Sequence, residues 1–219
     1  MSITKNLTQI KSQLPSQVTL VAVSKTKPVA DLMEAYTAGQ RIFGENKIQE
    51  MTEKWEQMPK DIEWHMIGHV QTNKVKFMAE YVSLIHGVDS LKLLQEINKQ
   101  AKKHNRIIDC LLQIHIAEEE TKFGLDEEEL NHILTSDDFK SLENIRIVGL
   151  MGMATFTENQ NQIEKEFNHL KAIFDNSKKL NTLSMGMSGD YQLAISCGST
   201  MVRIGSSIFG TRNQKNEKI

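Results

Sequence analysis

Two segments at opposite ends of the sequence carry groups that could do chemistry. Lys25 stands at the end of a short apolar run, residues 19–24, and Pro28 follows three positions later. A buried strand that ends in one amine, just before a helix started by proline, is how a barrel presents a reactive lysine. Segment 198–210 has the pattern of a strand followed by a Gly/Ser turn, whose free backbone N–H groups could hold a phosphate.

An amine at one end of the chain and a phosphate cradle at the other indicate a phosphorylated aldehyde held as a Schiff base, and pyridoxal phosphate is the obvious candidate. Each signal is weak when taken alone. A lysine that ends a strand is usually a surface lysine with its amine in water, and Ser188 could simply cap the helix that follows it. The prediction of a pyridoxal phosphate site therefore rests on the lysine and the Gly/Ser turn taken together.

The elements that must position these groups alternate between two hydrophobic periods. Near-continuous apolar, β-branched runs, typical of a buried parallel sheet, predict strands over 20–24, 41–45, 63–68, 82–86, 107–116, 145–154, 182–187 and 201–206. Apolar residues three to four apart predict helices between them, for example from Leu91 to Ala101 and over 159–179, and an extra helix at 3–14. Eight strands alternating with helices predict an α/β fold, a single (β/α)8 TIM-like barrel with an extra N-terminal helix.

A flavodoxin-like or Rossmann sheet is the weaker alternative, because it needs fewer strands and no Gly-x-Gly-x-x-Gly follows the first strand. No Pro- or Gly-rich linker divides the chain. We therefore expect one barrel domain over residues 1–213 and a short polar tail over 214–219.

A barrel gathers its chemistry at the carboxyl ends of its strands, and its loops after strands seven and eight commonly bind phosphate. The Gly/Ser-containing segments 185–189 and 205–207 occupy those two loops. Arg203 lies inside an apolar strand, so it demands either an internal carboxylate or a ligand acceptor. His65 and His69 have a spacing that could bind metal on a helix, but their stretch has the pattern of strand and turn, so we expect no metal site.

Composition and charge restrict the class of protein. The 219 residues are 39% hydrophobic and 25% charged, and 26 basic side chains nearly balance 28 acidic ones, so no overall field attracts nucleic acid or a membrane. Cys110 and Cys197 are far apart and form no Cys-x-x-Cys pair, which argues against a disulfide framework. Without a signal peptide or an apolar run of about 18 residues, we expect a cytoplasmic protein.

Five motifs, in order along the chain, resemble the pyridoxal phosphate homeostasis protein family, which is related to the N-terminal barrel of alanine racemase. They are Val21-Ala-Val-Ser-Lys-Thr-Lys-Pro28, Phe43-Gly-Glu-Asn46, Trp64-His-Met-Ile-Gly-His-Val-Gln-Thr-Asn-Lys74, Leu183-Ser-Met-Gly-Met-Ser188 and Gly198-Ser-Thr-Met-Val-Arg-Ile-Gly-Ser-Ser-Ile-Phe-Gly-Thr-Arg212. Several ordered motifs together are far more specific than any one of them.

The resemblance implies a role for each of six residues in binding pyridoxal 5'-phosphate. Lys25 would form the Schiff base, and Arg203 would approach the pyridine nitrogen. Asn46 would lie near the cofactor ring. The phosphate would be held by three residues, Ser188, Gly205 and Ser206.

Two functions compete for such a site. The first is a non-catalytic protein that buffers pyridoxal phosphate and delivers it, with apo-enzymes as candidate recipients. The second is an amino-acid racemase, which needs two bases on opposite faces of the substrate carbon. Related racemases take the second base, a tyrosine, from an added domain, which we do not expect here, and Tyr191 remains a weak candidate. We expect the carrier, acting as a monomer.

Overall fold

A computed structural model describes residues 2–121, 123–177 and 179–211. Eight strands form a closed, wholly parallel barrel in the order β1 to β8, and β1 pairs with β8 to complete it. The strands are β1 (Thr19–Val23), β2 (Ile42–Glu45), β3 (Glu63–Met66), β4 (Leu84–Val88), β5 (Ile108–Gln113), β6 (Ile145–Met151), β7 (Thr182–Met187) and β8 (Met201–Ile204). The predicted (β/α)8 barrel is confirmed.

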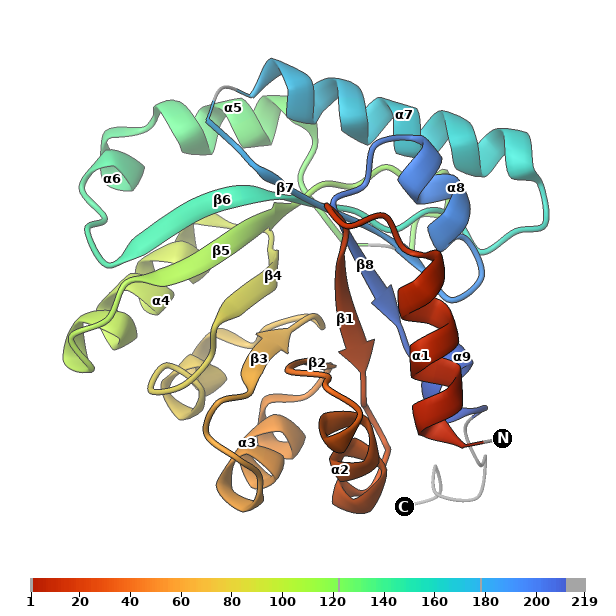
Figure 1. Cartoon of the computed structure of the whole chain (residues 1–219). Coiled ribbons are helices and arrows are strands. Elements are labelled where there is room, and N and C mark those ends of the chain that lie inside the picture. Colours follow the sequence, from red (N-terminus) through yellow and green to blue (C-terminus); the bar gives the residue numbers. More distant parts are fainter. Residues whose placement is uncertain (1, 122, 178, 212–219) are drawn as a thin grey trace.

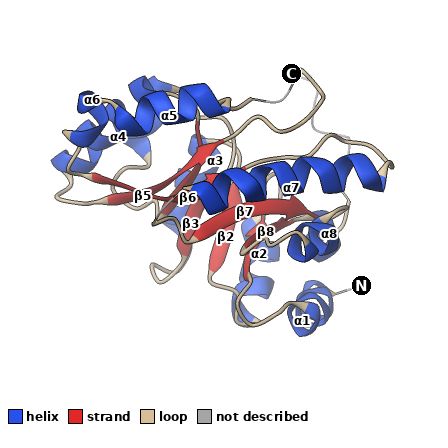
Figure 2. Ribbon diagram, turned by 90° about the horizontal axis from the view of Figure 1, so that it is seen from above, coloured by secondary structure: helices blue, strands red, loops and turns tan. Residues whose placement is uncertain are grey.

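Helices surround the strands, as the view in Figure 2 shows. They are α1 (Ile3–Gln13), α2 (Val29–Thr37), α3 (Ile48–Gln57), η1 (Thr72–Phe77), α4 (Leu91–Lys103), α5 (Glu127–Thr135), α6 (Asp137–Lys140), α7 (Gln160–Asn176), α8 (Tyr191–Ser196) and α9 (Ser206–Phe209), where η1 is a 3-10 helix. The predicted N-terminal helix is present as α1, which begins at the N-cap Ser2 and packs beside α9 and α2 (Figure 1). None of these helices, within the described residues, has the length and apolar character needed to traverse a bilayer.

The alternation of side chains along β1 explains both layers of the core. Side chains of successive strand residues point to opposite faces of a sheet. Val21 belongs to the small cluster that fills the barrel, together with residues such as Leu84 and Met201, whereas Leu20 and Ala22 belong to the larger cluster between strands and helices. The same alternation carries Val23 and Lys25 to the cavity at the barrel mouth.

The strand boundaries differ from the predicted ones at several ends: β5 and β6 each end three residues earlier than expected, and β4 lies two residues later than expected. The amide of Val82 donates to the carbonyl of Met78 at 2.9 Å, and the Val82 carbonyl accepts from Arg106 at 2.7 Å. The Val82 amide is therefore used in a turn and its carbonyl by the Arg106 side chain, and the strand begins later. The predicted tail, residues 214–219, lies outside the described residues.

Candidate functional site

A cavity of about 580 Å³ opens at the carboxyl ends of the strands, where a barrel places its chemistry. Its lining includes all six residues proposed from the sequence, which are Lys25, Asn46, Ser188, Arg203, Gly205 and Ser206. They come from four loops or strands that are far apart in the sequence. The structure therefore brings the six residues to one cavity, while the role of each residue stays a prediction.

Lys25 lies in a tight turn at the end of β1 and is half-buried. The amide of Lys27 donates to the carbonyl of Ser24 at 3.1 Å, which closes the turn around Lys25. Thr26, the third residue of the turn, has a φ of 63°, the left-handed value that a type II turn requires at that position. The turn thus ends the strand at the point where Lys25 reaches the cavity.

Arg203 is buried in β8. Among the described residues, no carboxylate accepts a hydrogen bond from its guanidinium. Its guanidinium donates to the Ser184 hydroxyl and, at 3.2 Å, to the Gly152 carbonyl. Burial lowers the pKa of Arg203 to about 10, and the charge of Asp190 opposes that shift. The side chain therefore stays cationic at neutral pH and adjoins the cavity.

A chain of buried polar side chains extends from Arg203 across the barrel. Ser184 contacts His86 Nδ1 at 3.0 Å, and His86 Nε2 contacts His65 Nδ1 at 3.0 Å. Burial lowers the pKa of His65 to about 3 and that of His86 well below its usual value, so both rings are neutral. The sequence analysis considered His65 only as a metal ligand and did not find this chain, which joins three strands distant in sequence.

The loops after β7 and β8 meet at the side of the cavity. The Gly205 amide donates to the Ser188 hydroxyl at 3.2 Å, and α9 begins at the next residue, Ser206. A Cβ on Gly205 would lie 3.1 Å from the Val23 carbonyl oxygen, so β8 and β1 approach closely there. The two predicted phosphate loops are thus in direct contact.

Other lining residues were not assigned a binding role from the sequence. Lys27 lines the cavity, and its amine donates to the carbonyls of Phe209 at 3.0 Å and Thr211 at 3.3 Å. Phe123 and Phe156 form an exposed apolar part of the rim, and Phe123 stacks on His69 with ring centroids 4.8 Å apart. Phe123 and Phe156 stand in loops outside the motifs and carry no periodic pattern, so nothing in the sequence marks them.

Two further groups of residues bear on the chemistry. No cluster of three or more His, Cys, Asp or Glu side chains suited to a metal ion occurs within the described part of the chain. The three tyrosines are all described, and none lines the cavity. Tyr36 donates to Asp61 at 2.8 Å, Tyr81 contacts Thr52 at 2.8 Å, and Tyr191 donates to Gln13 at 3.5 Å.

Comparison with known proteins gives consistent matches. Residues 1–213 match the family model described as "Alanine racemase, N-terminal domain". The chain is 37% identical over 232 residues to the pyridoxal phosphate homeostasis protein of Pasteurella multocida, covering 97% of this chain and 99% of that protein. It is 39% identical to the protein of the same name from Haemophilus influenzae, covering 90% and 86% respectively.

Solved structures show the same relationship. PipY of Synechococcus elongatus PCC7942, solved with PLP bound, superposes with a TM-score of 0.87 at 34% identity, covering 95% of this chain and all of that one. An alanine racemase of Clostridium difficile has a TM-score of 0.81 at 17% identity, with 98% of this chain matched to 61% of the racemase chain. At that identity the racemase shares the fold alone.

Proposed function

Because this chain belongs to the pyridoxal phosphate homeostasis protein family, we propose that it binds pyridoxal 5'-phosphate and buffers and delivers it without catalysing a reaction. The observation that carries the proposal is the convergence of Lys25, the buried Arg203 and two Gly/Ser loops on a single cavity. The structure of PipY with PLP bound supports the choice of cofactor. A protein of this kind works in the cytoplasm, where thiols such as Cys110 and Cys197 stay reduced.

The residues of the cavity fit the chemical groups of that cofactor. When bound, the cofactor supplies an aldehyde that condenses with a lysine amine and releases water. Lys25 would provide that amine. Arg203, held by Ser184 and Gly152, would face the ring nitrogen and, as a cation, keep that nitrogen unprotonated. This arrangement weakens the electron-withdrawing power on which catalysis by such cofactors depends.

Ser188, Gly205 and Ser206 would bind the phosphate through hydroxyl and backbone N–H groups, and Asn46 would lie beside the ring. Ser188 and Gly205 already contact one another at 3.2 Å, so an anion at their junction would meet donors from both loops. Hydrogen bonds to a charged acceptor contribute about 1.5–3 kcal/mol each, so several of them can decide whether the cofactor is retained.

A carrier is favoured over a racemase because no tyrosine, the residue that related racemases use as the second base, lines the cavity. The hydroxyls of Tyr36, Tyr81 and Tyr191 all contact residues away from the cavity. A single lysine can take a proton from one face of a substrate carbon, but racemisation needs a second group on the other face. We therefore infer a carrier that passes its cofactor to apo-enzymes, and we propose separately that it acts as a monomer.

The visible spectrum of the purified protein tests the cofactor and the reaction together. The wild-type protein should be yellow, and adding an L-amino acid should leave its enantiomer undetectable. Lys25→Ala should lose the yellow band and the adduct that borohydride traps. An adduct at unchanged yield in Lys25→Ala would contradict the lysine assignment, with Lys27 and Lys74 the next candidates, and steady racemisation would favour the enzyme.

Two further measurements test delivery and assembly. Mixing the loaded protein with an apo-enzyme that needs the cofactor should restore its activity faster than spontaneous release from the carrier allows. Sedimentation should give the mass of one chain, 24.9 kDa. A dimer at micromolar concentration would contradict the proposed monomer but would not bear on the proposed cofactor site.

A further inference from the structure

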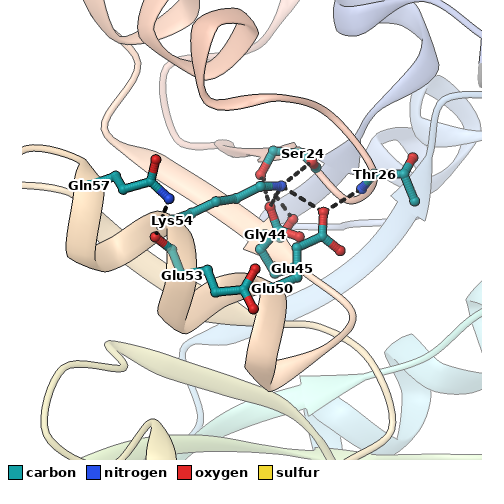
Figure 3. Close-up of polar contacts among 8 residues, drawn as sticks. All are labelled: Ser24, Thr26, Gly44, Glu45, Glu50, Glu53, Lys54 and Gln57. Atoms are coloured by element: carbon teal, nitrogen blue, oxygen red, sulfur yellow. Dashed lines mark hydrogen bonds and ion pairs between the residues drawn. The ribbon is translucent and has the colours of Figure 1, made fainter.

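A buried cluster of charged side chains lies between β1, β2 and α3, directly behind the turn that carries Lys25 (Figure 3). Lys54, on α3, donates from its amine to Glu45 at 2.6 Å, to Glu50 at 2.8 Å and to the Ser24 carbonyl at 2.8 Å. The side chains of Lys54 and Glu45 are 7% and 0% exposed. An ammonium group has three donors, and these three acceptors use all of them.

The contacts of this cluster hold both peptide groups beside Lys25. Lys54 binds the carbonyl of Ser24, the residue immediately before Lys25. Glu50 accepts from the amide of Thr26, the residue immediately after it, at 2.6 Å. Ser24 is held a second time, because its hydroxyl donates to Glu45 at 2.6 Å. The backbone on either side of Lys25 is therefore tied to the cluster.

The turn needs such support. Thr26 has a φ of 63°, and a β-branched residue in the left-handed region is a genuine outlier. Strained conformations of this kind persist only where the surrounding structure over-determines them, and they gather at functional sites. The Glu50 carboxylate supplies an acceptor for the Thr26 amide in the strained conformation.

Stability alone does not account for the cluster. Taking charges out of water is expensive, and replacing a buried ion pair by apolar side chains is often neutral or stabilising. Lys54 lies on the buried face of α3 with Ile48 and Met51, where an apolar side chain would ordinarily pack. What the charged side chains add is a set of directional bonds to the backbone of the Lys25 turn.

We propose that Glu45, Lys54 and Glu50 form a positioning site that holds the Lys25 backbone, so that the lysine amine meets the aldehyde of the bound cofactor. The inference rests on the proposed function, because it assumes that Lys25 is the attachment point. These three residues act through Lys25 and are absent from the lining of the cavity.

The lead experiment uses Glu50, which is the most exposed member of the cluster and the safest to replace. Glu50→Ala removes the acceptor for the Thr26 amide, and Glu50→Gln restores an oxygen acceptor at the same place. Glu50→Ala should bind pyridoxal phosphate about tenfold more weakly and be trapped more slowly by borohydride, and Glu50→Gln should recover most of both. Hydrogen exchange at the Thr26 amide should accelerate in Glu50→Ala alone.

Pyridoxine 5'-phosphate, which lacks the aldehyde, separates positioning from a general loss of the site. Glu50→Ala should bind it within about twofold of wild type, because the phosphate loops belong to β7 and β8. Glu45→Gln combined with Lys54→Met provides a second test that leaves no lone buried charge in place of the pair. It should weaken binding of pyridoxal phosphate and spare that of pyridoxine 5'-phosphate.

Arg106→Met is the matched control. Like Lys54, Arg106 is a cation that donates to the backbone, in this case to the carbonyls of Ala79 and Val82 at 2.7 Å, but at the opposite end of the barrel. The Arg106→Met substitution should lower stability and leave the affinities for pyridoxal phosphate and pyridoxine 5'-phosphate unchanged. Wild-type affinity and trapping rate in Glu50→Ala, or an equal loss for both ligands, would overturn the proposal. A wild-type protein that gives no trapped adduct would instead overturn the proposed function, and this inference with it.

Discussion

Arg203 is a buried cation beside the cavity, and two neutral acceptors hold it. Arg203→Gln removes the charge and leaves the Ser184 hydroxyl and the Gly152 carbonyl with fewer donors. We expect the free energy of unfolding, measured in urea, to fall by about 1.5–3 kcal/mol, the usual contribution of hydrogen bonds to a charged group. Ser184→Ala should cost less, because Gly152 still accepts from the arginine. Equal stability of Arg203→Gln and wild type would contradict this account.

Glu45 should make stability depend on pH. Burial, opposed by Lys54, raises the pKa of Glu45 to about 7 from a usual value of 4.5, and its Oε2 is buried without a recorded partner among the described residues. Between pH 4.5 and about pH 7, Glu45 of the folded protein holds a proton that the same side chain releases in the unfolded chain. This contribution to stability is therefore fully present below about pH 4.5 and is lost as the pH rises through 7, by about 1.4 kcal/mol per unit of pKa difference.

Urea unfolding of wild type and Glu45→Gln at a series of pH values measures this effect. The stability of wild type relative to the variant should decline from pH 4.5 to 7 and then stay constant. Taking the difference removes other titrating groups, including His65 and His86, whose lowered pKa values act in the opposite direction as the pH falls. A difference that does not change with pH would show that Glu45 ionises normally.

At the scale of elements, α1 supports the loop proposed to hold the phosphate. Asn6 of α1 donates to the Ile208 carbonyl of α9 at 3.0 Å, and α9 begins directly after Gly205. Asn6→Ala should weaken binding of pyridoxal phosphate a few-fold and cost about 1 kcal/mol of stability, because one hydrogen bond is lost. Titration by absorbance and urea unfolding measure the two effects.

Leu7→Ala separates packing from this specific contact. Leu7 is fully buried in the core beneath α1, so its truncation should cost about 2–5 kcal/mol. If Asn6→Ala and Leu7→Ala weaken binding in proportion to their loss of stability, α1 acts only as a packing element. A loss of affinity in Asn6→Ala beyond that proportion supports the proposed link to α9.

At the scale of the whole molecule, the cofactor should stabilise the entire barrel, because the proposed site draws on β1, β2, β7 and β8. A ligand that binds only the folded state adds about 2.7 kcal/mol at a hundred times its Kd. Thermal unfolding should therefore shift upward with pyridoxal phosphate, and much less with pyridoxal, which lacks the phosphate. Equal shifts with the two ligands would contradict the proposed phosphate-binding loops but would not contradict the assignment of Lys25.

The sequence by itself determined the barrel and the placement of the six proposed residues. Parallel strands buried on both faces have near-continuous apolar runs, and a barrel aligns all their carboxyl ends. The position of Lys25 after the first run and of Gly205 after the last was therefore enough to bring both to one mouth. Both results follow from local sequence pattern and from a fold that brings the carboxyl ends of all its strands to one rim.

Only the tertiary structure decided what surrounds those residues. Lys54 has the sequence pattern of an ordinary helix lysine, yet it lies buried against Ser24, thirty positions away. The chain from His65 through His86 to Ser184 joins three strands. Hydrogen-bond partners of this kind depend on distances between elements far apart in sequence, and neither hydrophobic period nor motif spacing carries that information.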